Sequence, residues 1–182
     1  ANASSSRDTF YNTLAKTAEA NLPFASSRIA IRLEHGYKLD PKPNEEEEHE
    51  VEERTFLVVA GLRGGDARRM ACSEEMSHLK LVPMGAVAAC IGRRQGPYNK
   101  VVEDPASFPS LPGQAFCFLP LPVLTKLPVH VNGYFELSTD GRQIWHSEDT
   151  SGESKLRSDW NVCMLRDVIA PLYADLLKIA IK

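Results

Sequence analysis

Apolar and polar positions alternate with two different periods in the first part of the chain. Residues 7–24 carry apolar or small side chains four positions apart, which predicts one face of a helix, at Phe10, Leu14, Ala18 and Leu22. Pro23 cannot continue a helix, so we expect this one to end near Asn21. The next segment, 27–35, alternates apolar with charged residues and so predicts a half-buried strand, with Ile29, Ile31 and Leu33 set between Arg28, Arg32 and Glu34.

A block of glutamates separates this strand from the next. Residues 36–52 contain Gly36, two prolines and many like charges that repel one another, so we expect a mobile acidic loop. An acidic docking arm for a basic partner is the alternative interpretation. Residues 51–62, "VEERTFLVVAGL", predict a second strand, and the two strands should form an antiparallel hairpin across the loop.

The middle of the chain alternates short elements with turns. The glycines at 61, 64 and 65 match no phosphate-binding loop, so residues 61–79 predict a turn followed by a helical or irregular segment. Residues 80–92 are apolar and predict a buried strand with Pro83 at its edge or start. Residues 93–113 contain four prolines and no apolar period, which predicts a long loop.

A second hairpin is expected next, with a strand, a proline-bounded turn and another strand at 114–121, 122–128 and 129–137. Val129, Val131 and Phe135 share one face only if Gly133 keeps a regular strand position. A bulge at Gly133 is the alternative.

The last segment has the apolar spacing of a long helix, at Trp160, Cys163, Met164, Val168, Leu172, Leu176 and Ile179. Ser158 or Asp159 is the expected N-cap residue. Pro171 removes a hydrogen bond to the carbonyl of Asp167 and should kink or divide the helix.

The order of these elements defines the expected fold class. A helix, a hairpin, a strand, a hairpin and a long helix do not alternate regularly, so we expect an α+β fold with a mixed, mainly antiparallel sheet covered by helices. The length of 182 residues suits a single domain spanning 1–182. The chain starts with "ANASSSRD" and lacks an initiator methionine, so we also expect it to be a segment of a larger multidomain protein.

Composition limits the cellular compartments and the classes of partner that suit this chain. A net charge of -3 provides no general attraction to nucleic acid or to an anionic membrane, and no apolar run is long enough to insert into a bilayer. The four cysteines form no CxxC pair, as expected for free thiols in a reducing, cytoplasmic compartment. Cys72 with His78 is the nearest approach to zinc-ligand spacing, and we expect no metal site.

Catalytic patterns are missing from the sequence. There is no nucleophile elbow, the five histidines suggest no triad, and His130 inside a strand is typical of a structural histidine. We therefore expect no enzymatic activity from this chain by itself. Five polar or aromatic residues surround one loop between a strand and the last helix: Arg142, Gln143, Trp145, Arg157 and Asp159.

Two interpretations of that loop remain open from the residues alone. Arg142 is either a solvated surface charge or a cation positioned by a rigid turn. Trp145 is expected to anchor the turn from below, and Arg157 and Asp159 to pair locally with little effect on stability.

A family resemblance adds to this picture. The sequence "GQAFCFLPLPVLTKLPVHVNGYFELSTDGRQIW", followed by "LRSDWNVCMLRDVIAPLYADLL", resembles the internal repeats of sacsin-type proteins. It covers residues 113–178, and 81–92 adds a shorter match. In those proteins each repeat begins with an ATPase domain related to the ninety-kilodalton heat-shock chaperones. The resemblance implies a fold similar to the middle segment of those chaperones.

The resemblance also implies a chaperone-type function. An arginine after a strand pair would reach the nucleotide of the upstream ATPase domain, as an arginine finger does, and Arg142 matches it, with Gln143 beside it. Supporting positions are Asn132, Trp145, Arg157, Asp159 and Trp160. ATP and Mg would be bound by the adjacent domain and not by this chain. Client proteins or co-chaperones are the further partners implied.

One position departs from the family pattern. Sacsin-type repeats tend to carry two adjacent arginines before the aromatic residue, and here the first of them is Gly141. One cation is left instead of two. A non-catalytic scaffold or protein-interaction domain, formed by a degenerate repeat, is therefore the alternative function.

Overall fold

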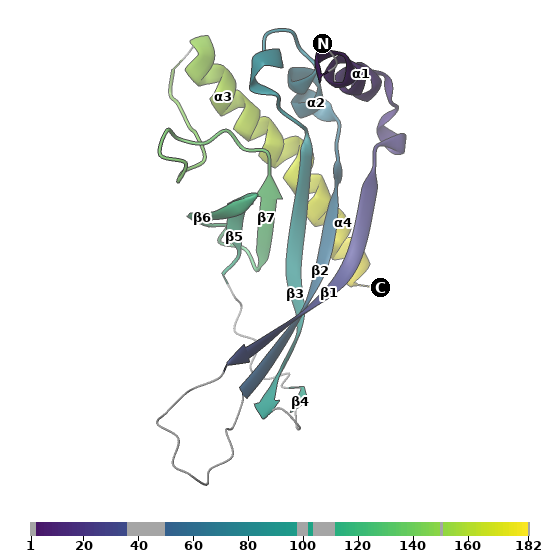
Figure 1. Ribbon diagram of the computed structural model, residues 1–182, viewed down its shortest axis with the longest axis vertical. Helices are drawn as coiled ribbons and strands as arrows, with labels where there is room; N and C mark the ends of the chain where they lie inside the picture. The colour runs from purple at the N-terminus through teal and green to yellow at the C-terminus, as the bar shows by residue number, and fades with distance from the viewer. Residues whose placement is uncertain (1–2, 36–49, 98–101, 104–111, 150, 182) are drawn as a thin grey trace.

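The computed structural model describes residues 3–35, 50–97, 102–103, 112–149 and 151–181. Its helical elements are α1 (Ala3–Lys16), η1 (Glu19–Asn21), α2 (Gly65–Ala71), η2 (Ser77–Leu79), α3 (Gly152–Cys163), η4 (Met164–Ile169) and α4 (Ala170–Ala180). Its strands are β1 (Phe24–His35), β2 (Glu50–Leu62), β3 (Met84–Pro97), β4 (Val102–Glu103), β5 (Gln114–Cys117), β6 (Leu119–Leu124) and β7 (Val129–Gly133). The long strands β1, β2 and β3 extend well beyond the helices (Figure 1).

All strands belong to one mixed sheet. Six of them follow the order β1-β2-β3-β7-β5-β6, and β4 pairs with β3. Every pairing is antiparallel except that of β5 with β7, which is parallel. The expected α+β class with a mixed, mainly antiparallel sheet is confirmed.

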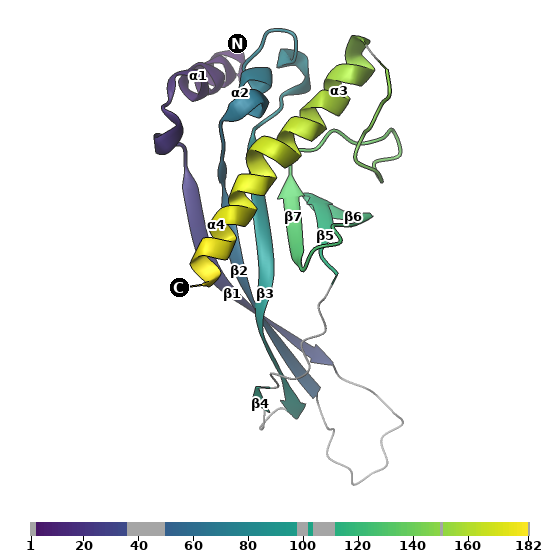
Figure 2. The same ribbon diagram turned by 180° about the vertical axis from the view of Figure 1, so that it is seen from behind.

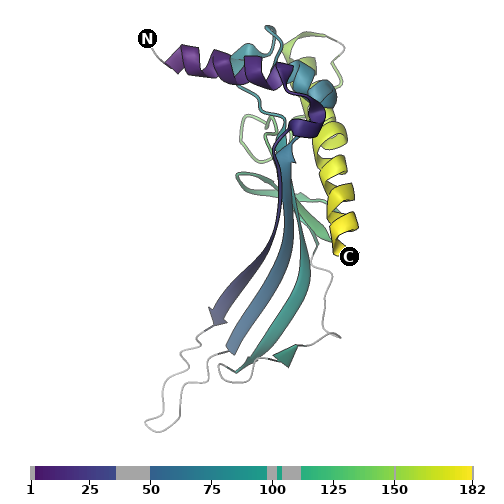
Figure 3. The same cartoon turned by 90° about the vertical axis from the view of Figure 1, so that its right-hand side faces the viewer.

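The helices cover one face of the sheet. Figures 2 and 3 show α3, η4 and α4 as one long rod against β2, β3 and β7, with α1 and α2 at one end of the sheet. Two glycines let the rod come close, because a Cβ at Gly85 would lie 2.8 Å from Ile169 Cδ1 and one at Gly133 would lie 3.1 Å from Met164 Cε. Among the described residues, no helix covers the opposite face.

The first hairpin is confirmed, with a small change at its tip. β1 and β2 pair antiparallel from Phe24 with Gly61 to His35 with Glu50. β2 begins at Glu50, so residues 50–52 belong to a strand and not to the expected acidic loop. Residues 36–49 of that loop lie outside the described residues.

The third strand is longer than expected. β3 continues from Met84 to Pro97, so the start of the expected long loop is strand instead. Most of the rest of that loop lies outside the part of the chain that the structure describes. Ile91 is an extra residue in β3, because Thr55 pairs with Gly92 while Phe56 pairs with Cys90. The bulge lets a strand with ordinary alternation bend and continue.

The expected second hairpin is wrong. Phe118 has a left-handed backbone, with φ of +60°, and it folds the predicted strand 114–121 into two antiparallel strands, β5 and β6. β7 then pairs with β5 in parallel and with β3 in antiparallel orientation. Gly133 keeps a regular register opposite Gly85, so there is no bulge at that position. The expected strand 129–137 is shorter than predicted, because β7 ends at Gly133. Val129 and Val131 are buried on one face of β7, and Phe135, which follows the strand, is buried as well.

Two helix boundaries also differ from expectation. The last helix begins at Gly152 after the N-cap residue Ser151, so Ser158 and Asp159 lie inside it. The expected division near Pro171 is present: the π-helical segment η4 separates α3 from α4 just before the proline, a rearrangement that accommodates the missing hydrogen bond. At the other end of the chain, α1 ends at Lys16, and the 3-10 turn η1 leads to Pro23.

The core lies between the sheet and the long helical rod. Trp160, Met164, Val168 and Leu172 are fully buried there against Val59 and Val87 and further strand residues. Among the described side chains of α1, residues 9–16, only Leu14 is buried, and Phe10 is 41% exposed. Leu22 is buried too, but it lies beyond the end of the helix, so the predicted apolar face is only partly correct. In the described part of the chain, no helix is long and apolar enough to cross a membrane.

Candidate functional site

A tight turn at residues 138–143 carries Arg142. The bridge between Leu137 and Ile144 closes it, and the backbone N–H of Ser138 donates to the carbonyl of Gln143 at 2.8 Å. Inside the turn, the N–H of Gly141 donates to the carbonyl of Ser138 at 2.8 Å. The pair Leu137 with Ile144 thus forms the base of the turn, and residues 139–142 form its polar tip.

Asp140 fixes the tip from within. Its Oδ1 accepts the hydroxyl of Ser138 at 2.5 Å and the backbone N–H of Arg142 at 3.1 Å. The hydrogen bond from Ser138, followed by the one from Arg142, lowers the pKa of the Asp140 carboxyl. The backbone of Arg142 is therefore held by a carboxylate two residues earlier, in the manner of an Asx turn.

The side chain of Arg142 itself is free to meet another molecule. It is exposed, and among the described residues its guanidinium makes no ion pair or hydrogen bond. Gln143 is exposed as well and contributes to the turn through its backbone. The sequence prediction of an arginine placed on an ordered turn is thus consistent with the geometry.

Asn161 on α3 ties the base of the turn to the helical rod. It is 3% exposed, and its Oδ1 accepts the backbone N–H of Glu136 at 2.9 Å. Its Nδ2 donates to the carbonyls of Glu136 and Trp145, both at 2.8 Å. Both strands that lead into the turn are therefore fastened to one side chain. Sequence reasoning did not single out this residue, although the quoted motif "RSDWN" contains it.

Arg157 provides a second fastening one helical turn earlier. Its Nε donates to Glu136 Oε2 at 2.8 Å and its guanidinium donates to the carbonyl of Leu137 at 2.7 Å. The same guanidinium lies 4.9 Å from the ring centre of Trp145, in cation–π geometry. The predicted local pair of Arg157 with Asp159 is wrong: Asp159 pairs with Lys155 on the helix surface.

The two tryptophans anchor the same region. Trp145 is half-buried, and its indole N–H donates to the carbonyl of Ser154 at 3.0 Å, which ties the end of the turn segment to the start of α3. Trp160 is completely buried, and its indole N–H donates to the carbonyl of Tyr134 at 2.7 Å. Ser158 accepts the N–H of Ser147 at 3.2 Å. Most side chains of the motif "RSDWN" therefore hold the segment 134–147 against α3 by hydrogen bonds.

Asn132 has its role farther away. Its Oδ1 accepts the backbone N–H of Phe118 at 3.0 Å, which stabilises the left-handed bend between β5 and β6. The structure does not bring Asn132 to the turn that carries Arg142. It acts as a structural residue of the sheet.

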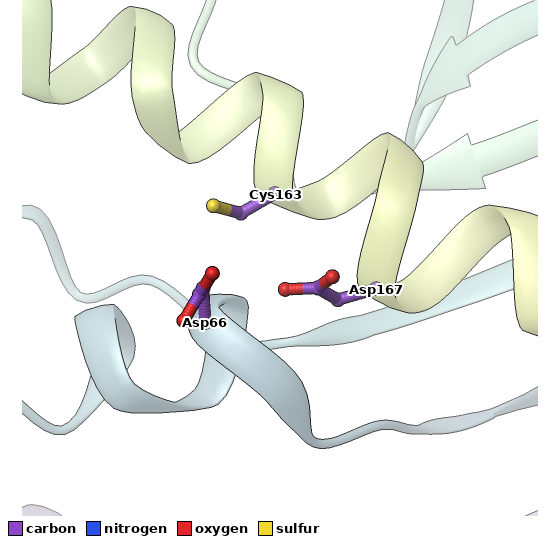
Figure 4. Close-up of side chains that lie close together, drawn as sticks. All are labelled: Asp66, Cys163 and Asp167. Carbon is purple, nitrogen blue, oxygen red and sulfur yellow. The ribbon is translucent and has the colours of Figure 1, made fainter.

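A cluster of possible metal ligands lies between α2 and the helical rod. Figure 4 shows Asp66, Cys163 and Asp167 pointing toward one another, with ligand atoms within 4.8 Å. Arginines already occupy both carboxylates: Arg166 pairs with Asp66 at 2.5 Å and with Asp167 at 2.6 Å, and Arg69 also pairs with Asp66.

The chemistry of this cluster fits an ion-pair network better than a cation site. The hydrogen bond from Arg166 lowers the pKa of the Asp167 carboxyl, while burial raises the pKa of the Cys163 thiol and keeps it protonated. Asp167 also accepts the backbone N–H of Ala67 at 3.1 Å. The network joins α2 to η4.

The open face of the sheet forms an apolar groove of about 380 Å³. Its lining residues are Ile29, Ile31, Phe56, Val58, Ala86, Ala88, Phe116, His130, Val131 and Asn132. Sequence reasoning placed Ile29 and Ile31 on the buried side of their strand, but each is 45% exposed. The sequence did contain one signal for an apolar surface on both faces of the sheet. It is the continuous apolar run of β2, because such runs are typical of strands with both faces covered.

Comparison with known proteins finds a local similarity to one very large protein. No family model matches the chain, and no solved structure matches it. Human sacsin is 41% identical to this chain over 99 residues, which are 54% of the chain and 2% of sacsin. The chain thus contains a sacsin-like segment and spans only a small fraction of that relative's length.

Proposed function

We propose that this chain is a chaperone-type module of a sacsin-like protein. It cooperates with an adjacent ATPase domain by presenting Arg142 to the nucleotide of that domain, which would also bind ATP and Mg. In layout it would correspond to the middle segment of the ninety-kilodalton heat-shock chaperones. The observation that supports this proposal is the exposed, unpaired guanidinium of Arg142 on a turn braced by Asn161 and Arg157.

The physical argument concerns preorganisation. An arginine can stabilise charge that develops on a phosphoryl group only if its backbone is already in place when the nucleotide arrives. Here Asp140 holds the backbone N–H of Arg142, while two helix side chains hold the base of the turn. A planar, permanently charged fork then projects into solvent, where only another domain can meet it.

ATP turnover by a polypeptide that joins this chain to its native upstream domain tests the proposal. Arg142→Ala should lower turnover by about 10³-fold, the lower end of the range for arginine fingers. Arg142→Lys keeps a charge but loses the planar fork, so it should recover only part of that loss. Arg94→Ala is the control, because this arginine is also exposed, at 47%, and lies far from the turn on β3, where its contact with Glu53 at 3.8 Å is a surface pair of little energetic value.

A scaffold without a role in the nucleotide cycle is the second candidate, and Gly141 favours it. Its φ of +68° is a backbone conformation that an arginine adopts only with strain, so the turn has adapted to a single cation. Equal turnover by the wild type and Arg142→Ala would support the scaffold and reject the arginine finger. No turnover from either polypeptide would also favour a degenerate repeat.

A further inference from the structure

The two edges of the sheet are built differently. β6 forms one edge and contains Pro120 and Pro122, which lack the N–H group that an added strand would need. β1 forms the other edge, is twelve residues long and contains no proline. No described element pairs with its outer side. Natural sheets usually protect such a long edge, so an unprotected one indicates a place for strand addition.

Backbone geometry shows which groups of β1 point outward. The N–H of Leu62 donates to the carbonyl of Pro23 at 2.9 Å, next to the pair Phe24 with Gly61. In an antiparallel ladder the bonded residues alternate, so the odd-numbered residues of β1 bond to β2. The backbone N–H and C=O groups of Ser26, Arg28 and Ala30 therefore face the free edge.

Both sides of β1 are open at its described side chains, those of residues 24–31. Ile29 and Ile31 lie on the side away from α4, in the groove with Phe56 and Val58, and each is 45% exposed. The helical rod packs over β2 and β3, as Figure 3 shows, and leaves the outermost strand uncovered. An added strand with apolar residues on the groove side would extend the apolar surface and bury both isoleucines.

Arg28 gives the other side of β1 a charge. It alternates with the isoleucines and lies opposite Leu57 in the register. Its side chain is exposed and has no carboxylate partner within the described ranges. An acidic residue on a neighbouring strand would satisfy it, because opposite charges directly across a strand pair are stabilising.

We propose that the β1 edge accepts an extended segment of a partner protein in which apolar residues alternate with acidic ones. The apolar residues would cover Ile29 and Ile31, and the acidic ones would meet Arg28. A second copy of β1 matches less well, because this strand offers a single acidic residue, Glu34, beside arginines at 28 and 32. This interaction is independent of Arg142 and of any nucleotide.

Peptide binding to the full 182-residue chain tests the proposal. The probes are two fluorescent peptides about eight residues long, a usual strand length, with valine alternating with glutamate in one and with lysine in the other. The glutamate peptide should bind about tenfold more tightly than the lysine peptide, and its binding should weaken with added salt. Binding is followed by fluorescence anisotropy.

Two variants separate the backbone contribution from the charge. Ala30→Pro removes an N–H that faces outward and leaves the ladder to β2 intact, so it should weaken binding about tenfold. Arg28→Glu changes only an exposed side chain, so it should fold normally and reverse the preference toward the lysine peptide. Circular dichroism and thermal unfolding show whether each variant is folded.

Three results would overturn the proposal. One is equal binding of both peptides, or of neither, to the folded wild type. Another is an unchanged peptide preference in Arg28→Glu. The third is a wild type that sediments as a dimer and an Ala30→Pro variant that sediments as a monomer, which would identify a second copy as the occupant of the edge.

Discussion

Replacing Asn161 with alanine tests whether the motif "RSDWN" braces the turn that carries Arg142. The amide of Asn161 holds two backbone groups that have no other described partner, the N–H of Glu136 and the carbonyl of Trp145. The carbonyl of Glu136 keeps the N–H of Trp145, at 2.8 Å, after the substitution. Two partly buried polar groups are therefore left unpaired.

The expected loss follows from those two groups. Each unsatisfied buried group costs about 1 to 3 kcal/mol, so Asn161→Ala should lower the free energy of unfolding by about 2 to 4 kcal/mol if water reaches part of the site. Asn161→Asp leaves no cavity and keeps the acceptor for Glu136, but it sets a carboxylate against two carbonyls. It should be destabilised by a similar amount at neutral pH.

Urea unfolding followed by tryptophan fluorescence measures the loss, because the carbonyl of Trp145 accepts the Asn161 amide and Trp160 is its neighbour in the chain. Asn12→Ala is the matched control, since this asparagine is exposed on α1 and its replacement should change stability by less than about 0.5 kcal/mol. Losses below about 1 kcal/mol for both Asn161 variants would refute the bracing role, because one orphaned group alone should exceed that.

Two further predictions concern His130 and Gly141. Burial, and then the charge of Arg54, lowers the pKa of His130, whose Nδ1 accepts the N–H of Gln114 at 3.1 Å. The imidazole of His130 therefore binds a proton more readily in the unfolded chain than in the folded one. The free energy of unfolding should be highest above the ordinary histidine pKa and should fall as the pH drops toward the lower pKa of His130 in the folded chain. In urea unfolding between pH 7.5 and 5.5, about the range in which histidine titrates, His130→Gln should lose this dependence, and an unchanged slope would contradict the assignment. Gly141→Arg has open space for its side chain but a φ of +68°, so the free energy of unfolding should fall by about 1 kcal/mol; an unchanged urea midpoint would show that the turn relaxes.

The candidate site was predictable only in part. The placement of Arg142 on a turn followed from the local order of strand, turn and helix. The partner of Arg157 did not, because Glu136 is 21 residues away and no local pattern reports such a contact. Asp159 looked like the nearer partner, yet it lies on the solvent side of α3 and pairs with Lys155.

The sheet, too, was predictable where its contacts are local and unpredictable where they are distant in the sequence. Alternation in 27–35 and the apolar run in 51–62 were enough to predict β1, β2 and their hairpin, because these pairings join neighbours in the chain. The strand 114–121 was expected to be continuous. A left-handed residue at Phe118 divides it, and a hydrogen bond from the Phe118 N–H to the side chain of the distant Asn132 stabilises that bend.

The sequence by itself determined the mixed α+β class, the first hairpin, the long C-terminal helix and the sacsin-like motif. Periodicity reports which residues share a face, since it depends only on the geometry of one strand or helix. Which face is covered depends on what packs against it, and that is a property of the assembled chain. Tertiary structure alone therefore decided that Ile29 and Ile31 point to an open groove, that β5 joins β7 in parallel, and that α3 braces the turn of Arg142.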